Sequence, residues 1–165
     1  MPKAKYQLDD FLVLVGDGCN GYVLKIHDMM MHEGFKLKIQ LTKTYGLHVS
    51  YSQPKIKSVK GIAMYLLVQG GRLMIRINAD NYAKYPEILN RLPERILNQM
   101  DSADDCKKFI DPEKCWQGCG GYDICIRGRQ YKKCIVNCFL LDVDADSFPF
   151  LIELVSSEVK ERIGA

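Results

Sequence analysis

Apolar residues near the start of the chain recur with the period of an α-helix. The first stripe has the i, i+3, i+4, i+7 spacing and consists of Leu8, Phe11, Leu12 and Val15. This spacing predicts a short amphipathic helix that ends at Gly16. A second stripe, from Tyr22 to Met30, predicts another helix with Gly34 as its natural stop. The chain is therefore expected to begin with two helices.

After the second helix the hydrophobic period changes from 3.6 residues to 2. Apolar and polar residues alternate from position 35 to 42 and again from 47 to 51. Such alternation is typical of antiparallel strands that have one face on the core and one in solvent. Two further alternating runs, 62–69 and 72–78, are separated only by Gly70 and Gly71. This arrangement predicts a tight β-hairpin.

The second half of the chain mixes short helices with another hairpin. The expected elements are helices at 86–92 and 93–100, strands at 122–127, 130–136 and 139–143, and a final helix from Ser147. The two short helices each begin at a proline, which is tolerated at the first helical position. The second hairpin is expected to turn around Gly128 and Arg129.

These elements predict one α+β domain, a mostly antiparallel sheet with helices packed on one face. A chain of 165 residues, of which 47% are hydrophobic, is long enough to bury its own core. The expected parts of domain 1–165 are the N-terminal helices (1–34), a basic antiparallel sheet (35–79), short helices (80–105), a cysteine-rich loop and hairpin (106–146) and a C-terminal helix (147–163).

The apolar runs of the chain are too short to span a bilayer, and no secretory h-region follows the first residues. We therefore expect a cytoplasmic protein without a membrane partner. Thiols are kept reduced in the cytoplasm, so clustered cysteines are expected to bind metal, act in catalysis or remain free rather than form disulfides.

Charge is distributed unevenly along the chain. Residues 34–79 include eight Lys or Arg and no Asp or Glu, whereas the rest carries 15 basic and 20 acidic residues. Strand alternation places several of these basic residues on the face opposite the core, and the candidate anion-binding residues are Lys36, Lys38, His48, Arg72 and Arg76. A face of one charge is suited to an anionic ligand, an acidic protein or nucleic acid. The alternative is that these side chains only solvate the sheet and guard its edges.

Six of the seven cysteines lie between Cys106 and Cys138, with no His nearby. A tetrahedral zinc ion needs four ligands, each sulfur about 2.3 Å from the metal. The glycine-rich stretch 115–121 is flexible enough to bring thiols together, and the predicted hairpin turns Cys134 away from its apolar face. On one straight strand Cys134 and Cys138 would be about 13 Å apart, too far to share an ion. The preferred ligand set is Cys106, Cys115, Cys119 and Cys134, with Cys138 as a replacement for Cys134.

Other interpretations of the cysteines remain open. Buried free thiols serve as small apolar side chains in many cores. Cys115 or Cys119 is also a candidate redox nucleophile, activated by neighbouring lysines. The chain has no C-x-x-C motif, and no catalytic triad or carboxylate pair can be assigned, so a non-enzyme is favoured over an enzyme. The expected function is a non-catalytic binding module with a structural cysteine cluster and zinc as candidate cofactor. The alternative is a thiol-dependent enzyme or redox sensor.

A further pattern in the sequence comprises residues 106–115, 121–123, Gly128, 131–134 and Phe139, and it extends back through 79–82 and the Leu92-Pro93 helix. In these residues the chain resembles a family of small, uncharacterised bacterial proteins common in anaerobic Firmicutes. The resemblance covers about the C-terminal half of the chain and implies no particular activity. It implies that four cysteines recur as a set: Cys106, Cys115, Cys119 and Cys134. Cys19, Cys125 and Cys138 lie outside that set.

Overall fold

A computed structural model describes residues 6–53, 61–115 and 119–164. The helices are α1 (Leu8–Val15), α2 (Asp17–His32), η2 (Tyr82–Lys84), α3 (Pro86–Asn90), α4 (Glu94–Asp101), α5 (Lys107–Ile110), η3 (Pro112–Lys114) and α6 (Phe148–Gly164). The strands are β1 (Lys36–Thr42), β2 (Gly46–Ser52), β3 (Ile62–Gln69), β4 (Arg72–Ile77), β5 (Tyr122–Ile126), β6 (Arg129–Lys133) and β7 (Leu140–Asp142).

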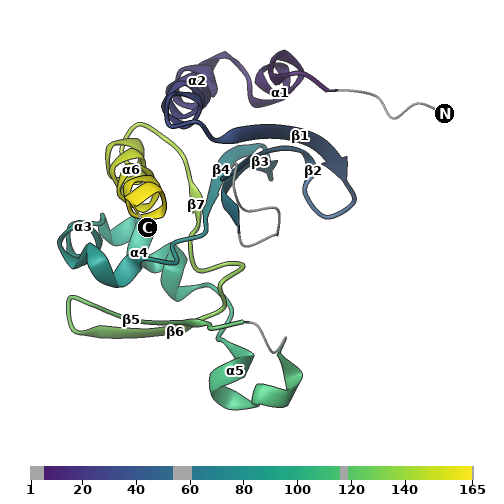
Figure 1. Cartoon of the computed structure of the whole chain (residues 1–165). Helices are drawn as coiled ribbons and strands as arrows, with labels where there is room; N and C mark the ends of the chain where they lie inside the picture. The colour runs from purple at the N-terminus through teal and green to yellow at the C-terminus, as the bar shows by residue number, and fades with distance from the viewer. Residues whose placement is uncertain (1–5, 54–60, 116–118, 165) are drawn as a thin grey trace.

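The larger sheet of the described chain is antiparallel, with strand order β1-β2-β3-β4-β7, and β5 and β6 form a separate hairpin. Helices α1, α2 and α6 lie on one side of the larger sheet, whereas the β5–β6 hairpin and α5 lie at the far end of the molecule, beyond α3 and α4 (Figure 1). This architecture confirms the predicted α+β class.

The buried face of the larger sheet follows the predicted alternation. The strand register aligns its fully buried side chains in adjacent rows: Val49, Tyr51, Met64, Leu66, Ile75, Ile77 and Leu141. Helices α2 and α6 cover this face, for example with Ile26 and Leu154, both fully buried in the same core. The Gly70-Gly71 turn pairs Gln69 with Arg72, as predicted.

The β5–β6 hairpin turns one residue earlier than predicted. Ile126 pairs with Arg129, so the turn residues are Arg127 and Gly128, and both have positive φ, at 50° and 78°. Hairpin turns of two residues favour this conformation, but a non-glycine residue is strained in it. Arg127 is held there by Asn90, whose side-chain oxygen accepts from the Arg127 N–H at 3.0 Å and whose carbonyl accepts from Arg127 Nε at 2.7 Å. A contact across 37 residues therefore selects the turn.

Strand β6 also ends earlier than predicted, at Lys133. The ammonium group of Lys133 donates to the carbonyl oxygens of Asp101 and Ala103 at the end of α4 and pairs with Asp105 at 2.8 Å. Beyond it the chain turns, and the Cys138 N–H donates to the Cys134 carbonyl at 3.0 Å. The two cysteines do not lie on one straight strand, so the prediction that they are about 13 Å apart does not apply.

A buried polar network attaches α6 to the loop that follows β4. Glu158, only 1% exposed, accepts hydrogen bonds from the backbone N–H groups of Asp80 and Asn81 and from the hydroxyl of Tyr85. It also pairs with Arg162 at 2.8 Å, one helical turn further along. Because an ionised side chain is strongly disfavoured away from water unless its partners are close, this network depends on every one of its members.

Candidate functional site

Three of the four preferred ligand cysteines lie together beside Gly121. Cys106 and Cys119 are buried, with exposed fractions of 1% and 5%, and Cys115 is half-buried. A side chain at Gly121 would place its Cβ 2.6 Å from the sulfur of Cys106. The thiol of Cys115 lies close enough to that of Cys119 to raise its pKa. We call the group of Cys106, Cys115 and Cys119 the thiol cluster.

Hydrogen bonds position the segments that carry the thiol cluster. The Cys106 N–H donates to the carbonyl of Lys132 at 2.9 Å, next to the bridge between Asp105 and Lys133. Cys106 then precedes α5. The ammonium group of Lys108 in α5 donates to the carbonyl of Cys119 at 2.5 Å. Helix α5 and the β5–β6 hairpin therefore bring Cys106 next to two cysteines of the glycine-rich stretch, Cys115 and Cys119.

The two remaining candidate ligands, Cys134 and Cys138, differ in how deeply they are buried. Cys134 is half-buried, and its N–H donates to the carbonyl of Asp104 at 2.9 Å, so it flanks the same bridge as Cys106. Cys138 is fully buried in the main hydrophobic core. Burial raises the pKa of the Cys138 thiol to about 12, against the opposing charge of Lys133. Cys134 is therefore better placed than Cys138 to join the thiol cluster.

The Cys119 thiol lacks the environment of a reactive cysteine. Burial raises its pKa, a backbone hydrogen bond from Gly121 lowers it, and the neighbouring Cys115 and Cys106 raise it, with a net upward shift. Redox nucleophiles require the opposite shift, because the thiolate is the reactive form. Lys108 does not act on the sulfur through its hydrogen bond, which goes to the backbone carbonyl of Cys119.

The thiol cluster does not form a finished metal site. Within residues 6–53, 61–115 and 119–164, no group of three or more His, Cys, Asp or Glu side chains is placed to hold a metal ion. Zinc binding would require the sulfur atoms to move closer together, to about 2.3 Å from a common ion. The zinc site therefore remains a prediction from residue type and neighbourhood.

All five candidate anion-binding residues lie on the sheet face opposite the core. The register pairs Lys38 with Ser50, Tyr65 with Arg76 and His48 with Leu67, so their side chains share one side of the sheet. Lys36 and Lys38 are exposed, and neither forms an ion pair with any described residue. We call this side of the sheet, carrying Lys36, Lys38, His48, Arg72 and Arg76, the basic face.

Aromatic rings lie at the centre of the basic face. The guanidinium of Arg76 lies 5.1 Å from the centre of the Tyr65 ring and donates to the Tyr45 hydroxyl at 2.9 Å. His48, only 1% exposed, packs edge-on against Tyr45 and is within 3.1 Å of Gln40 Nε2. The ring of His48 is therefore a support for the surface side chains. Tyr45 is absent from the sequence-based candidates because it lies in the β1–β2 turn, outside the strand alternation.

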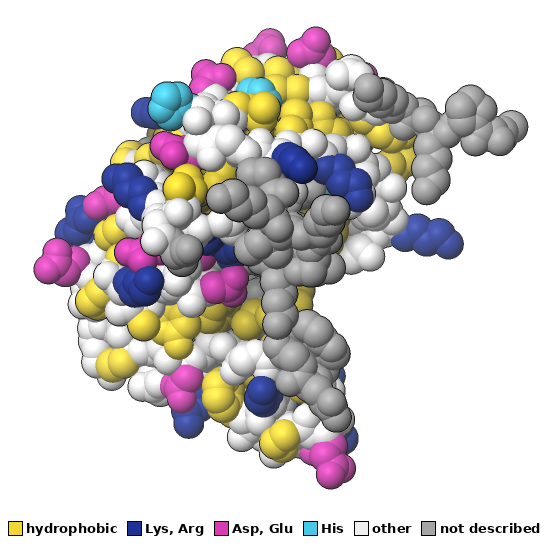
Figure 2. Space-filling view, viewed as in Figure 1, with side chains coloured by type: hydrophobic (Ala, Val, Ile, Leu, Met, Phe, Trp, Pro, Cys, Tyr) yellow, Lys and Arg dark blue, Asp and Glu magenta, His cyan; other side chains and the backbone are white. Residues whose placement is uncertain are grey.

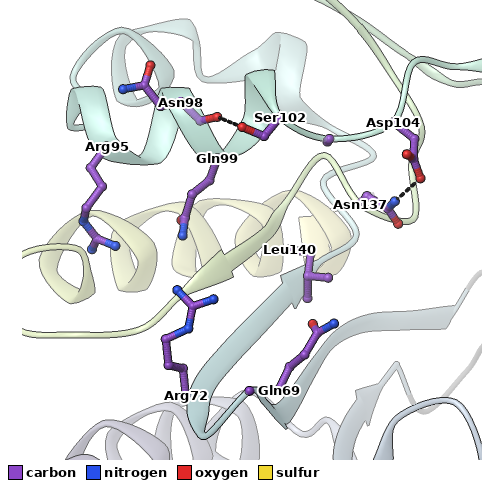
Figure 3. A pocket seen from close by; sticks show the side chains of 11 residues that line it. Gln69, Arg72, Arg95, Asn98, Gln99, Ser102, Asp104, Asn137 and Leu140 are labelled. Atoms are coloured by element: carbon purple, nitrogen blue, oxygen red, sulfur yellow. Dashed lines mark hydrogen bonds between the residues drawn. The ribbon is translucent and has the colours of Figure 1, made fainter.

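Arg72 lies at the edge of the basic face in a cleft with a volume of about 650 Å³. Figure 3 shows it pointing across the cleft toward α4, which carries Gln99 and Arg95. Both guanidinium groups are engaged: Arg72 pairs with Asp142 at 2.6 Å, and Arg95 pairs with Asp144 at 2.6 Å. The cleft is therefore close to charge neutrality. Arg95 could not be found from the sequence, because only packing brings α4 beside β4 and β7.

No protein-family model, curated protein or solved structure matches this chain. The resemblance to a bacterial family therefore stays a prediction. Among the described residues, no helix has the length and apolar character needed to cross a membrane.

Proposed function

We propose that this protein is a non-catalytic binding module of the cytoplasm. In this proposal the basic face engages an anionic partner, and the thiol cluster, with Cys134, binds zinc and stabilises the segment around α5. The observation that carries the proposal is the shared face of Lys36, Lys38 and Arg76 in a stretch, 34–79, that contains no acidic residue.

The distribution of charge favours an anionic macromolecule over a small ligand. Lysines on adjacent positions of one strand face create a positive potential that attracts an extended polyanion or acidic protein. Arg76 adds to this potential, although its stacking on Tyr65 fixes its direction. By contrast, Arg72 and Arg95 in the nearby cleft are already paired with carboxylates. Binding is therefore expected at the part of the basic face that carries Lys36 and Lys38, and not at the cleft.

The proposed structural role of zinc rests on how little else holds the α5 segment. Neither α5 nor η3 has a buried residue, and Ile110 is 74% exposed. Short segments without their own apolar core depend on a cross-link or metal for stability. A zinc ion bound by four cysteines has no open coordination position for substrate, so it would act on stability rather than catalysis.

We expect one zinc ion per chain in protein purified without a histidine tag, measured by elemental analysis and native mass spectrometry. Cys119→Ser is expected to lose the zinc, because it removes one of four ligands. Cys125→Ser is the matched control, since Cys125 is exposed on β5, and it should keep the metal. Absence of zinc, together with rapid alkylation of Cys115 or Cys119 at mildly acidic pH, would contradict the structural role and favour the redox alternative.

We expect the protein to bind a polyanion column and to elute with salt. Lys38→Glu is expected to lower the eluting salt concentration, because it removes a favourable charge and adds a repulsive one on the basic face. Lys160→Glu makes the same charge change on an exposed site of α6, which packs on the opposite side of the sheet. Equal shifts in the two variants would mean that net charge, and not the basic face, controls retention.

A further inference from the structure

We infer that the free edge of β1 is a docking site for an extended segment of a partner protein in which acidic and apolar residues alternate. This inference rests on the proposed function, which it narrows to one class of anionic partner. The segment would add a sixth strand to the larger sheet, next to β1. Three properties of β1 support this inference: its open backbone edge, its incompletely buried apolar side chains and its lysines without ion pairs.

The two edges of the larger sheet differ. Strand β7 forms one edge and spans only Leu140–Asp142, and the Asp142 N–H already donates to the side chain of Gln99 at 3.2 Å. Strand β1 forms the other edge and spans seven residues. Within the described chain, no backbone hydrogen bond joins β1 to any strand or loop other than β2. An edge of this length offers a row of free N–H and C=O groups.

Apolar burial is incomplete along β1. On the core side of the sheet, Val49 and Tyr51 of β2 are fully buried, whereas their cross-strand neighbours Ile39 and Leu37 are only half-buried. Leu41, further along the same side, is 60% exposed. Hydrophobic side chains reach the surface along this upper rim of the molecule, over α1, α2 and β1 (Figure 2). Apolar residues on an added strand would cover those of β1.

The opposite side of β1 determines the charge of the partner. Lys36 and Lys38 project there, exposed and without an ion pair among the described residues. Opposite charges on directly paired strand positions are favourable, and like charges are unfavourable. A partner strand with acidic residues beside the lysines and apolar residues beside Leu37 and Ile39 satisfies both sides. A second copy of β1 would instead bring further lysines to the same side.

Strand addition of this kind combines backbone affinity with side-chain specificity. The main chain of the partner would form backbone hydrogen bonds with the open edge of β1. These bonds do not depend on the side chains of the partner. The alternation of acidic and apolar residues would then select the partner and its register, because a slip of one residue places carboxylates on the apolar side. This selectivity separates the inference from general attraction to polyanions.

The probe for this inference is the acetylated peptide Glu-Val-Glu-Val-Glu-Val-Glu, labelled for fluorescence anisotropy, added to the full chain. We expect saturable binding and slower hydrogen exchange at the backbone amides of β1. Lys36→Glu with Lys38→Glu is expected to weaken binding at least about tenfold, because two cross-strand charge pairs are lost. The same peptide with alternate backbone nitrogens methylated should not bind, since it cannot complete the ladder.

The outcomes also separate this inference from the proposed function. Retention on a polyanion column without binding of the Glu-Val peptide would overturn strand addition and leave the basic face as an anion-binding surface. Failure of both would overturn the two together. Binding that survives backbone methylation would mean that charge alone attracts the peptide, and so would also overturn strand addition. A concentration-dependent dimer with protected β1 amides would show that a second copy occupies the edge instead.

Discussion

Replacing Glu158 with alanine is expected to destabilise the fold by about 3–5 kcal/mol, the range for removing one member of a buried ion pair. The carboxylate of Glu158 lies 2.8 Å from Arg162 and accepts from Tyr85 at 2.5 Å. Without it, the charge of Arg162, which is almost wholly buried, loses a compensating partner, and the N–H groups of Asp80 and Asn81 lose their acceptor. Guanidinium chloride unfolding followed by circular dichroism measures the effect.

The matched control is Glu161→Ala on the same helix. Glu161 pairs with Lys84 at 2.7 Å, but both side chains are substantially exposed, so the expected loss is below about 1 kcal/mol. Glu158→Gln keeps the shape and removes the charge, and should fall between the two alanine variants. Equal stabilities for Glu158→Ala and Glu161→Ala would mean that the network around Glu158 does not hold α6 to the loop after β4.

Replacing Gly121 with alanine is expected to disturb the thiol cluster and to reduce stability by about 2–4 kcal/mol, the combined cost of strain and overpacking. Gly121 has a φ of +65°, which favours glycine. An added Cβ would also lie 2.6 Å from the sulfur of Cys106 and 2.8 Å from the ring of Phe109. The expected readouts are a lower unfolding midpoint and faster alkylation of Cys106.

Gly120→Ala is a close control for this prediction. Gly120 adjoins Gly121 in the chain, but a Cβ there would have no heavy atom within 4 Å. This variant is therefore expected to unfold like the parent protein and to keep the same alkylation rates. If Gly121→Ala matched it in both measurements, Cys106 would not be packed against Gly121 in solution.

Local residue pattern predicted the main sheet well. Alternation placed residues 35–42 and 47–51 in strands, and the Gly70-Gly71 pair defined the register of β3 with β4. Period-2 alternation also placed Lys38 and Arg76 on the same face before any strand was paired, because every second side chain of a strand points the same way. These features depend on neighbours in the chain, so they can be derived from it.

The second hairpin was predicted less well because distant residues control it. The expected turn at Gly128 and Arg129 uses the glycine as its first residue, whereas the actual turn uses it as the second. The strained conformation of Arg127 is offset by its hydrogen bonds to Asn90. Local propensity disfavours a turn with a non-glycine residue in this conformation. The compensating contact with Asn90 comes from a distant part of the chain, so the sequence around the turn does not predict it.

The cysteines and basic residues were found from the sequence as a set, but their environments were not. Sequence spacing grouped Cys138 with the other thiols, whereas packing places it in the main core. Likewise, Arg72 shares the predicted face but pairs with Asp142, which is 70 residues away in the chain. Burial and ion pairing depend on which segments meet.

By itself, the sequence determined the α+β class, the strands of the main sheet, the one-signed charge of residues 34–79 and the presence of clustered thiols. These follow from hydrophobic period and composition, which act over a few residues. Only the tertiary structure decided that Cys106, Cys115 and Cys119 meet beside Gly121, that Glu158 is buried with its partners, and that β1 is left as an open edge. Each of these depends on contacts between distant segments, whose free energy no local pattern specifies.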